Sequence, residues 1–260
     1  MALEITAILA GTVAAATPLI FAGLGELVTQ RTGVINLGVE GMMLVGAIAG
    51  FAFAAQYDAS VLSALLMGGL AGMLMALIFA FFTLSLSTNQ SACGLALTIF
   101  GLGISAFLGQ NYVSMALPGL ANFNIPLLAD IPVLGPILFQ QNYVVYLSIL
   151  VFFLVWFVLA KTRLGLLLKA VGESPESAHA MGYHVLAIRY GAVLFGGLMA
   201  GVGGAFLSTV YTPMWIENMV AGQAIQPRPA TIFSIHIGVY TVDKNAPPTP
   251  AIKPPNSTAP

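Results

Sequence analysis

Charged residues are scarce in this chain of 260 residues. Lys, Arg, Asp and Glu together make up 7% of it, whereas 58% is hydrophobic. Average soluble domains carry roughly 25% charged residues, which cover their surface. The composition therefore excludes a soluble fold and predicts an integral membrane protein. The formal net charge is −1, so nothing indicates a nucleic-acid partner.

Cysteine and recognisable chemical motifs are also nearly missing. The single cysteine, Cys93, excludes an intramolecular disulfide. No G-x-x-x-x-G-K-[ST] loop occurs, so the chain does not bind ATP in that way. His179, His184 and His236 show no metal-ligand spacing with carboxylates inside an apolar run. The sequence thus predicts no enzyme, no metal site and no cofactor, and it places His179 and His184 on a solvated surface.

Long apolar runs are what the chain has instead. A helix that crosses a bilayer needs about 20 apolar residues, and a backbone in lipid must satisfy its own hydrogen bonds, which favours helices. The run at 91–109 is short and follows polar residues, so a broken or re-entrant segment is an alternative there. The predicted fold is all-α, a polytopic transmembrane helix bundle with about six spans at 3–25, 34–56, 60–86, 91–109, 142–160 and 185–210.

The distribution of Lys and Arg predicts the orientation. Cytoplasmic links of membrane proteins are enriched in these residues. The links at 26–33, 87–90 and 161–184 are therefore predicted to face the cytoplasm, and the Pro-rich link at 110–141 to be an ordered external loop. The N-terminus then faces outside, unless 26–41 is re-entrant rather than a simple turn. The cations on which this rests are Arg31, Lys161, Arg163, Lys169 and Arg189.

Glycines recur at four-residue spacing in three predicted spans. Glycine at this spacing lets helix backbones approach closely, and in lipid such packing replaces the hydrophobic driving force. We expect dense helix packing within the bundle from these pairs, in preference to a ligand-lined surface. They are Gly46 with Gly50, Gly68 with Gly72, and Gly197 with Gly201.

Polar residues enter the start of the second predicted span, in the segment 25–46. Glu40 is expected one to two turns into that span, where a charge costs about 2.5–3.5 kcal/mol, so it should face protein or water. Asn36 precedes it by four residues, which would place both on one helix face. In one interpretation Glu40 pairs with Arg31 or caps a broken helix. In the other, Asn36 and Glu40 line a polar path for a hydroxylated or nitrogenous solute.

The segment GESPESAHAMGYH at 172–184 predicts a short helix over 175–181. Ser174 suits the N-cap and Pro175 the first helical position, and Gly182 suits the position past the end. So short a helix is not stable alone. Ala178 and Met181 offer a small apolar face. The helix is therefore expected to dock on a cytoplasmic partner or, alternatively, on its own bundle.

Three segments resemble one family. TRLGLLLKAVGESPESAHAMGYHV at 162–185 resembles the cytoplasmic coupling loop of inner-membrane permeases of bacterial ABC importers, in the branched-chain amino acid and simple-sugar superfamily. The segments at 25–47 and 211–222 are similar to that superfamily's nucleoside branch. The resemblance implies a multi-pass inner-membrane (plasma-membrane) permease for nucleosides or simple sugars. Its coupling helix would comprise Glu173, Ser174, Pro175, Glu176, Ala178, Met181 and Gly182.

The same resemblance implies partners. These are a cytoplasmic ATP-binding subunit, a second permease subunit and an extracytoplasmic solute-binding protein. A secondary solute carrier is the alternative, but it would call for several intramembrane charges and internal repeats, and Glu40 is the one charge deep in a predicted span.

The composition changes near residue 222. Residues 223–260 are rich in proline, and from about 243 they are expected to be disordered because they lack apolar residues to bury. Family members continue with further apolar spans. We therefore expect a permease domain at 1–222 that lacks its last spans, with an atypical tail at 223–260 that arose by frameshift or truncation. A truncated, non-transporting remnant is a further alternative.

Overall fold

The computed structural model describes residues 2–113, 115–118, 141–216 and 219–220. The residues beyond 220, with His236, lie outside this described part, and so does most of the link at 110–141. The described elements are α1 (Ala2–Arg31), α2 (Val39–Tyr57), α3 (Val61–Ala80), η1 (Phe81–Ser85), α4 (Gln90–Gly109), η2 (Gln110–Tyr112), α5 (Tyr143–Lys161), α6 (Arg163–Glu173), α7 (Pro175–Ala180), α8 (Val185–Phe206) and η4 (Leu207–Tyr211).

Six helices of the described part are long and apolar enough to cross a membrane. They are α1, α2, α4 and α5, with α3 and α8 each extended by one π-helical turn, η1 and η4. The prediction of an all-α bundle with six spans is confirmed. The re-entrant alternative for 91–109 is wrong, because α4 is a continuous helix. Its start is fixed by Asn89, whose side chain accepts hydrogen bonds from the backbone N–H groups of Ser91 and Ala92 at 3.0 and 3.2 Å.

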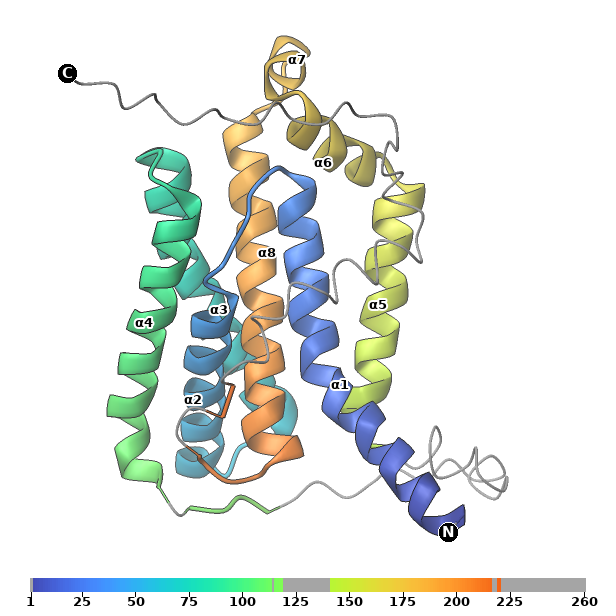
Figure 1. Cartoon of the computed structure of the whole chain (residues 1–260), viewed down its shortest axis with the longest axis vertical. Coiled ribbons are helices and arrows are strands. Elements are labelled where there is room, and N and C mark those ends of the chain that lie inside the picture. Colours follow the sequence, from blue (N-terminus) through green and yellow to red (C-terminus); the bar gives the residue numbers. More distant parts are fainter. Residues whose placement is uncertain (1, 114, 119–140, 217–218, 221–260) are drawn as a thin grey trace, which may run out of the picture. The chain divides into compact units, whose positions relative to one another are not determined.

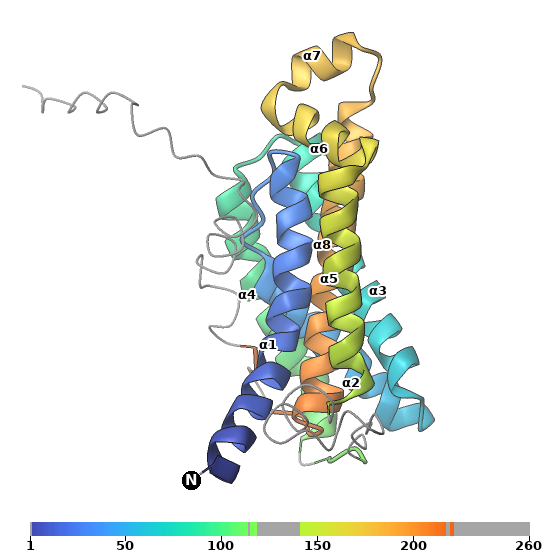
Figure 2. The same ribbon diagram turned by 90° about the vertical axis from the view of Figure 1, so that its right-hand side faces the viewer.

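Helix α8 lies at the centre of the bundle (Figure 1) and packs against α1, α2 and α3. Helix α4 packs on the outer side of α2, and α5 contacts α1. The chain passes up and down the bundle in alternation, so one end holds the end of α1, the starts of α4 and α8, and both α6 and α7. We call this the upper end, after its place in Figure 1. Figure 2 shows α7 lying beyond the ends of the spans.

The three predicted glycine pairs meet where α2, α3 and α8 cross. A Cβ atom added to Gly46 of α2 would lie 2.5 Å from the Cα of Gly201 in α8. One added to Gly72 of α3 would lie 2.7 Å from that same Cα, and Gly68 lies against the Gly46 carbonyl. We call this set (Gly46, Gly50, Gly68, Gly72, Gly197 and Gly201) the glycine junction. The expectation of close helix packing is confirmed, since no side chain larger than hydrogen fits between these backbones.

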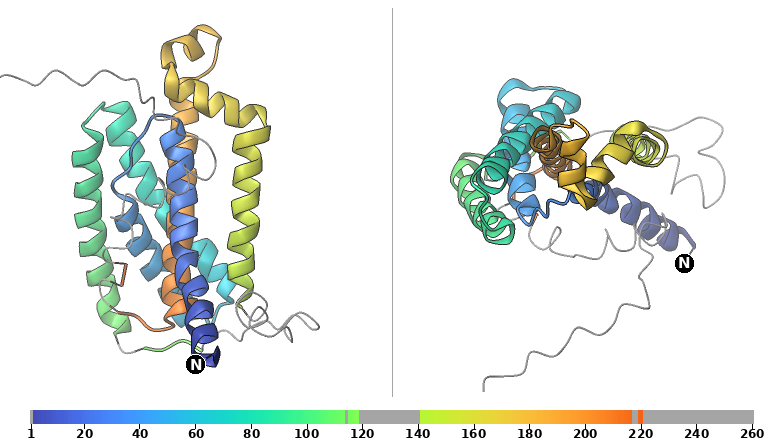
Figure 3. Two further views of the ribbon diagram at one scale, coloured as in Figure 1. Left: turned by 45° about the vertical axis from the view of Figure 1, so that its right-hand side comes forward. Right: turned by 90° about the horizontal axis from the view of Figure 1, so that it is seen from above.

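The link between α1 and α2 differs from the prediction. Span two was expected to begin at 34, but α1 continues to Arg31 and α2 begins only at Val39. Between them the chain runs without helix from the upper end to a point part-way along the bundle, as Figures 1 and 3 show. Segment 32–38 is thus neither a simple turn at the end of the bundle nor part of a helix.

The second difference is α6, which the sequence prediction missed. It runs across the upper end from α5 toward α7 (Figure 3). Val171 is buried, whereas Leu164 and Leu166 are exposed. Because α6 ends at Glu173 and α7 begins at Pro175, the two helices are joined by the single residue Ser174.

Candidate functional site

The predicted short helix is present as α7, Pro175–Ala180, one residue shorter than expected. Pro175 holds its first position, as predicted. Ser174 occupies the N-cap, but its hydroxyl donates to Ser177 Oγ at 2.7 Å and caps no backbone N–H. The end is a Schellman motif, in which Tyr183 N donates to Ala178 O and Gly182 N to His179 O. Gly182 has φ +88, so the predicted glycine stop is confirmed.

The prediction that Ala178 and Met181 form one apolar face of this helix is wrong. Ala178 is fully buried within the chain itself, at 0% exposed, whereas Met181 lies past the helix end and is 64% exposed. Glu173 and Glu176 are also exposed. One side of α7 therefore anchors it to the protein, and Glu176 and Met181 lie on its free surface, next to Glu173 at the end of α6. His179 and His184 are exposed as predicted.

The basic residues of the predicted cytoplasmic links gather at the upper end. Arg31 closes α1, Lys161 closes α5, and Arg163 and Lys169 belong to α6. Asp58 lies at the opposite end, in the turn between α2 and α3. The structure thus brings to one end the cations that the orientation prediction used, and that end also presents α7.

Segment 32–38 is non-helical, with turns at 32–33 and 37–38, and its residues alternate between inside and outside. Asn36 is 4% exposed, whereas its neighbours Ile35 and Leu37 are 54% and 48% exposed. Asn36 therefore does not share a helix face with Glu40, contrary to the prediction, because it precedes α2. Its Oδ1 accepts from Gly38 N at 2.9 Å, and its Nδ2 donates to Met42 Sδ at 3.4 Å. These bonds fix the bend that starts α2.

Side chains from α1 and α4 hold this non-helical segment. Glu26 of α1 accepts from Asn36 N through Oε1 at 3.3 Å. Gln90 of α4 accepts from Ile35 N at 2.9 Å, and Thr98 donates to Leu37 O at 3.2 Å. The roles of Gln90 and Thr98 were not predicted from the sequence. The polarity of Gln90 at the start of an apolar run was the available signal, whereas Thr98 lies inside that run.

Glu40 lies in the first turn of α2 and is 5% exposed. The prediction that it faces protein rather than lipid is confirmed. A carboxylate in the first turn also suits the positive end of the helix dipole. Helix α2 begins part-way along the bundle (Figure 1). The Glu40 carboxylate therefore lies away from both ends of the bundle, although it is in the first turn of a helix.

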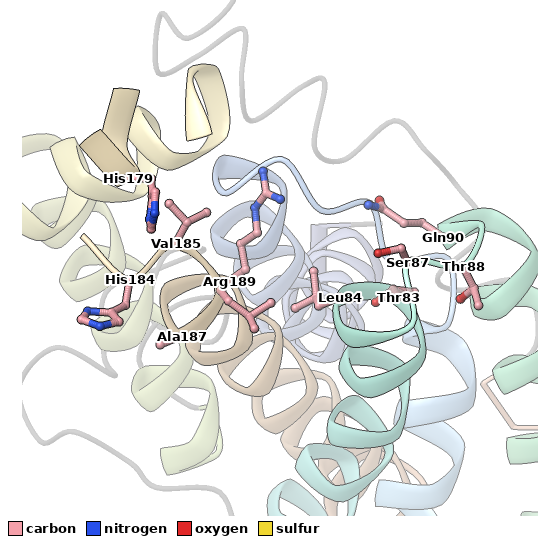
Figure 4. Close-up of a pocket in the computed structure, with 11 residues that line it drawn as sticks. Thr83, Leu84, Ser87, Thr88, Gln90, His179, His184, Val185, Ala187 and Arg189 are labelled. Carbon is pink, nitrogen blue, oxygen red and sulfur yellow. The ribbon is translucent and has the colours of Figure 1, made fainter. Parts of the chain in front are cut away.

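An open groove of about 730 Å³ lies at the upper end. One wall comes from Ser87 and Thr88, which precede α4, and from Gln90 at its start, and the other comes from the start of α8. Figure 4 shows Arg189 pointing away from His184, toward the end of α1. Within the described part of the chain, no three His, Cys, Asp or Glu side chains gather to hold a metal ion.

Apolar spans with a short helix displayed beyond one end define the chain as a polytopic membrane protein. A family model described as branched-chain amino acid transport system / permease component matches residues 8–239. The chain therefore belongs to this permease family, as the sequence resemblance implied. It is a multi-pass protein of the plasma membrane, and its family consists of transporter subunits rather than enzymes.

Three curated relatives are ABC transporter permeases. The putative glucose ABC transporter permease protein TsgC13 of Haloferax volcanii is 41% identical over 83% of this chain and 67% of its own length. The nucleoside ABC transporter permease protein NupC of Lactococcus lactis is 34% identical over 84% and 72%. The guanosine ABC transporter permease protein NupQ of Bacillus subtilis is 34% identical over 87% and 74%. No solved structure matches this chain.

Proposed function

We propose that the chain is a transmembrane subunit of an ATP-binding-cassette importer for nucleosides or simple sugars. Family membership is the observation that carries this proposal. The names of the relatives support the solute class, since two are permeases for nucleosides and one is a putative glucose permease. A separate cytoplasmic subunit would bind and hydrolyse ATP, and a second permease subunit and an extracytoplasmic solute-binding protein would complete the importer.

The ATP-binding subunit docks on α7 in this proposal. Its contacts are Glu173, Glu176 and Met181, because these side chains are exposed at the upper end. The remaining coupling residues shape the helix: Ser174 and Pro175 start it, Ala178 anchors it, and Gly182 ends it. Six helical residues would not hold together alone, so the buried Ala178 and the Schellman motif are what present this surface in a fixed form.

Asn36 and Glu40 belong to the substrate path in this proposal. Non-helical backbone at membrane depth is tolerated only where it is covered by protein or lines a water-filled cavity. The exposed edge of segment 32–38 therefore supports a path that runs along it. Asn36 and Glu40 are both buried. A solute would reach Asn36 only after the segment moves, so in this proposal the path is closed at Asn36.

We place the permease domain at 1–222 and propose that 223–260 is an atypical tail. The change of composition near 222 supports this boundary. The family match extends to residue 239 and so includes the first part of the tail.

Variants of α7 test the docking proposal. Glu176→Lys and Met181→Trp should insert into membranes normally but should no longer co-purify the ATP-binding subunit. Asp58→Lys is the matched control, because it reverses an exposed carboxylate at the opposite end of the bundle. Co-purification that is unchanged in both α7 variants would contradict the docking role. Solute uptake that continues without ATP would instead favour a secondary carrier.

A further inference from the structure

Arg189 joins the start of segment 32–38 to the end of α6, which leads into α7. Segment 32–38 and α7 are the two parts of the upper end on which the proposed function depends. It lies in the second turn of α8 and is half-buried. Its Nε donates to the carbonyl oxygen of Thr32 at 3.1 Å, and its Nη2 donates to that of Val171 at 3.5 Å. Thr32 begins segment 32–38, and Val171 lies in the last turn of α6. One guanidinium therefore holds the backbones that follow α1 and end α6.

The two backbones also touch each other directly beside this guanidinium. A Cβ atom on Gly172 would collide with the carbonyl oxygen of Arg31 and lie 3.2 Å from Gly33 N. Gly33 has φ +80, a left-handed conformation that glycine adopts at little cost. The end of α6 thus lies on the start of segment 32–38 with no side chain between them.

We call the contact of Gly172 with Arg31 and Gly33, together with the Arg189 guanidinium, the joint. Each side of the joint leads to a proposed functional element. From Gly172 the chain passes through Glu173 and Ser174 into α7. From Gly33 it runs to Asn36, whose side chain sets the start of α2. A displacement of α7 would therefore be passed to segment 32–38 through few residues, as long as the contacts of the joint stay intact.

We propose that Arg189 is a positioning residue that transmits the movement of α7 to segment 32–38. The proposal rests on the docking of an ATP-binding subunit on α7. Arginine suits the task because its planar fork donates to two carbonyl groups at once, which lysine cannot do with equal geometry. Its positive charge also suits the carbonyl ends of α1 and α6, where helix dipoles are negative. The joint moves as one unit, and the segment opens when α7 is displaced.

Spin-label distances in the assembled transporter test this proposal. Labels are placed on Ile35→Cys and Leu74→Cys in a Cys93→Ser background, since both positions are exposed and lie on segment 32–38 and on α3. The distance between the labels is measured with and without ADP–vanadate bound to the ATP-binding subunit. The chain with Arg189 intact should show a shift in this distance between the two states.

Arg189→Met should retain the ATP-binding subunit and lose the shift, with solute uptake reduced about tenfold. Arg189→Lys should fold and show a smaller shift than arginine. Arg163→Met, which replaces an exposed arginine at the start of α6, is the matched control and should behave as the parent.

A full shift in Arg189→Met, or in Arg189→Lys if the Met variant does not fold, would overturn the transmission role while leaving the docking proposal standing. A parent chain that binds the ATP-binding subunit but shows no shift would likewise overturn this inference alone. Failure of the parent to bind that subunit at all would overturn the proposed function, and this inference with it.

Discussion

The glycine junction and the upper end hold helices together in different ways. At the junction, α2, α3 and α8 meet backbone to backbone, and Gly201 lies against both Gly46 and Gly72. At the upper end one close backbone contact, of Gly172 with Arg31, is joined by a few polar side chains, such as Arg189 and Gln90, that bind carbonyl or N–H groups of segment 32–38. Dense packing tolerates little displacement, whereas a few hydrogen bonds can be exchanged. The junction is therefore the fixed part of the bundle, and the upper end is the part suited to movement.

Gly201→Leu should break the fixed part and have the largest effect. The new side chain would meet the Gly68 carbonyl and the Cα of Gly72, so α3 and α8 would have to separate. Overpacking of this kind costs about 1–3 kcal/mol or more, and we expect loss of folded protein in detergent, measured by size-exclusion chromatography and thermal unfolding. Gly103→Leu is the matched control, since a Cβ there meets nothing within 4 Å. Equal stability of the two variants would show that the junction is not tightly packed.

Glu40→Gln should affect transport more than folding. The amide keeps the shape of the buried side chain but removes its charge at the start of α2. If Glu40 belongs to the substrate path, uptake of labelled nucleoside or sugar by the assembled transporter should fall several-fold at normal expression, with an unchanged thermal midpoint. Unchanged uptake kinetics would instead assign Glu40 a purely structural role, and a lowered midpoint with proportionally less protein would do the same.

Lys169→Met should have the smallest effect, although it also lies at the upper end. Lys169 Nζ is 3.6 Å from Glu173 Oε1, but the two side chains are 54% and 70% exposed. Exposed pairs four residues apart on a helix contribute about 0.3–0.5 kcal/mol. Stability and uptake should therefore match the parent within error. A large loss would mean that this pair, and not only Arg189, holds the end of α6.

The spans could be predicted from the sequence because bilayer thickness and backbone hydrogen bonding leave few solutions for long apolar runs. The glycine pairs and the stop at Gly182 were also predictable, since each requires the absence of a side chain or a left-handed backbone. These features depend on local chemistry, and the structure has them where the sequence placed them, except that span two begins at Val39 rather than at 34.

The non-helical segment 32–38 could not be predicted in this way. The second span was predicted to begin at residue 34, because Val34, Ile35 and Leu37 are as apolar as the residues of a membrane-spanning helix. Its conformation depends on bonds from Glu26, Gln90 and Thr98 in other helices, which only the tertiary structure brings together. The face proposed for Ala178 and Met181 failed for a related reason, because α7 ends before Met181 and rests on Ala178.

The most direct test of the account is ATP-driven uptake by the assembled transporter in liposomes, compared between the parent chain and Met181→Trp. We predict that the parent takes up labelled nucleoside or sugar only with ATP, and that Met181→Trp loses both uptake and the bound ATP-binding subunit while remaining folded. A Met181→Trp transporter that binds this subunit and imports solute like the parent would contradict the claim that α7 is where the ATP-binding subunit drives the permease.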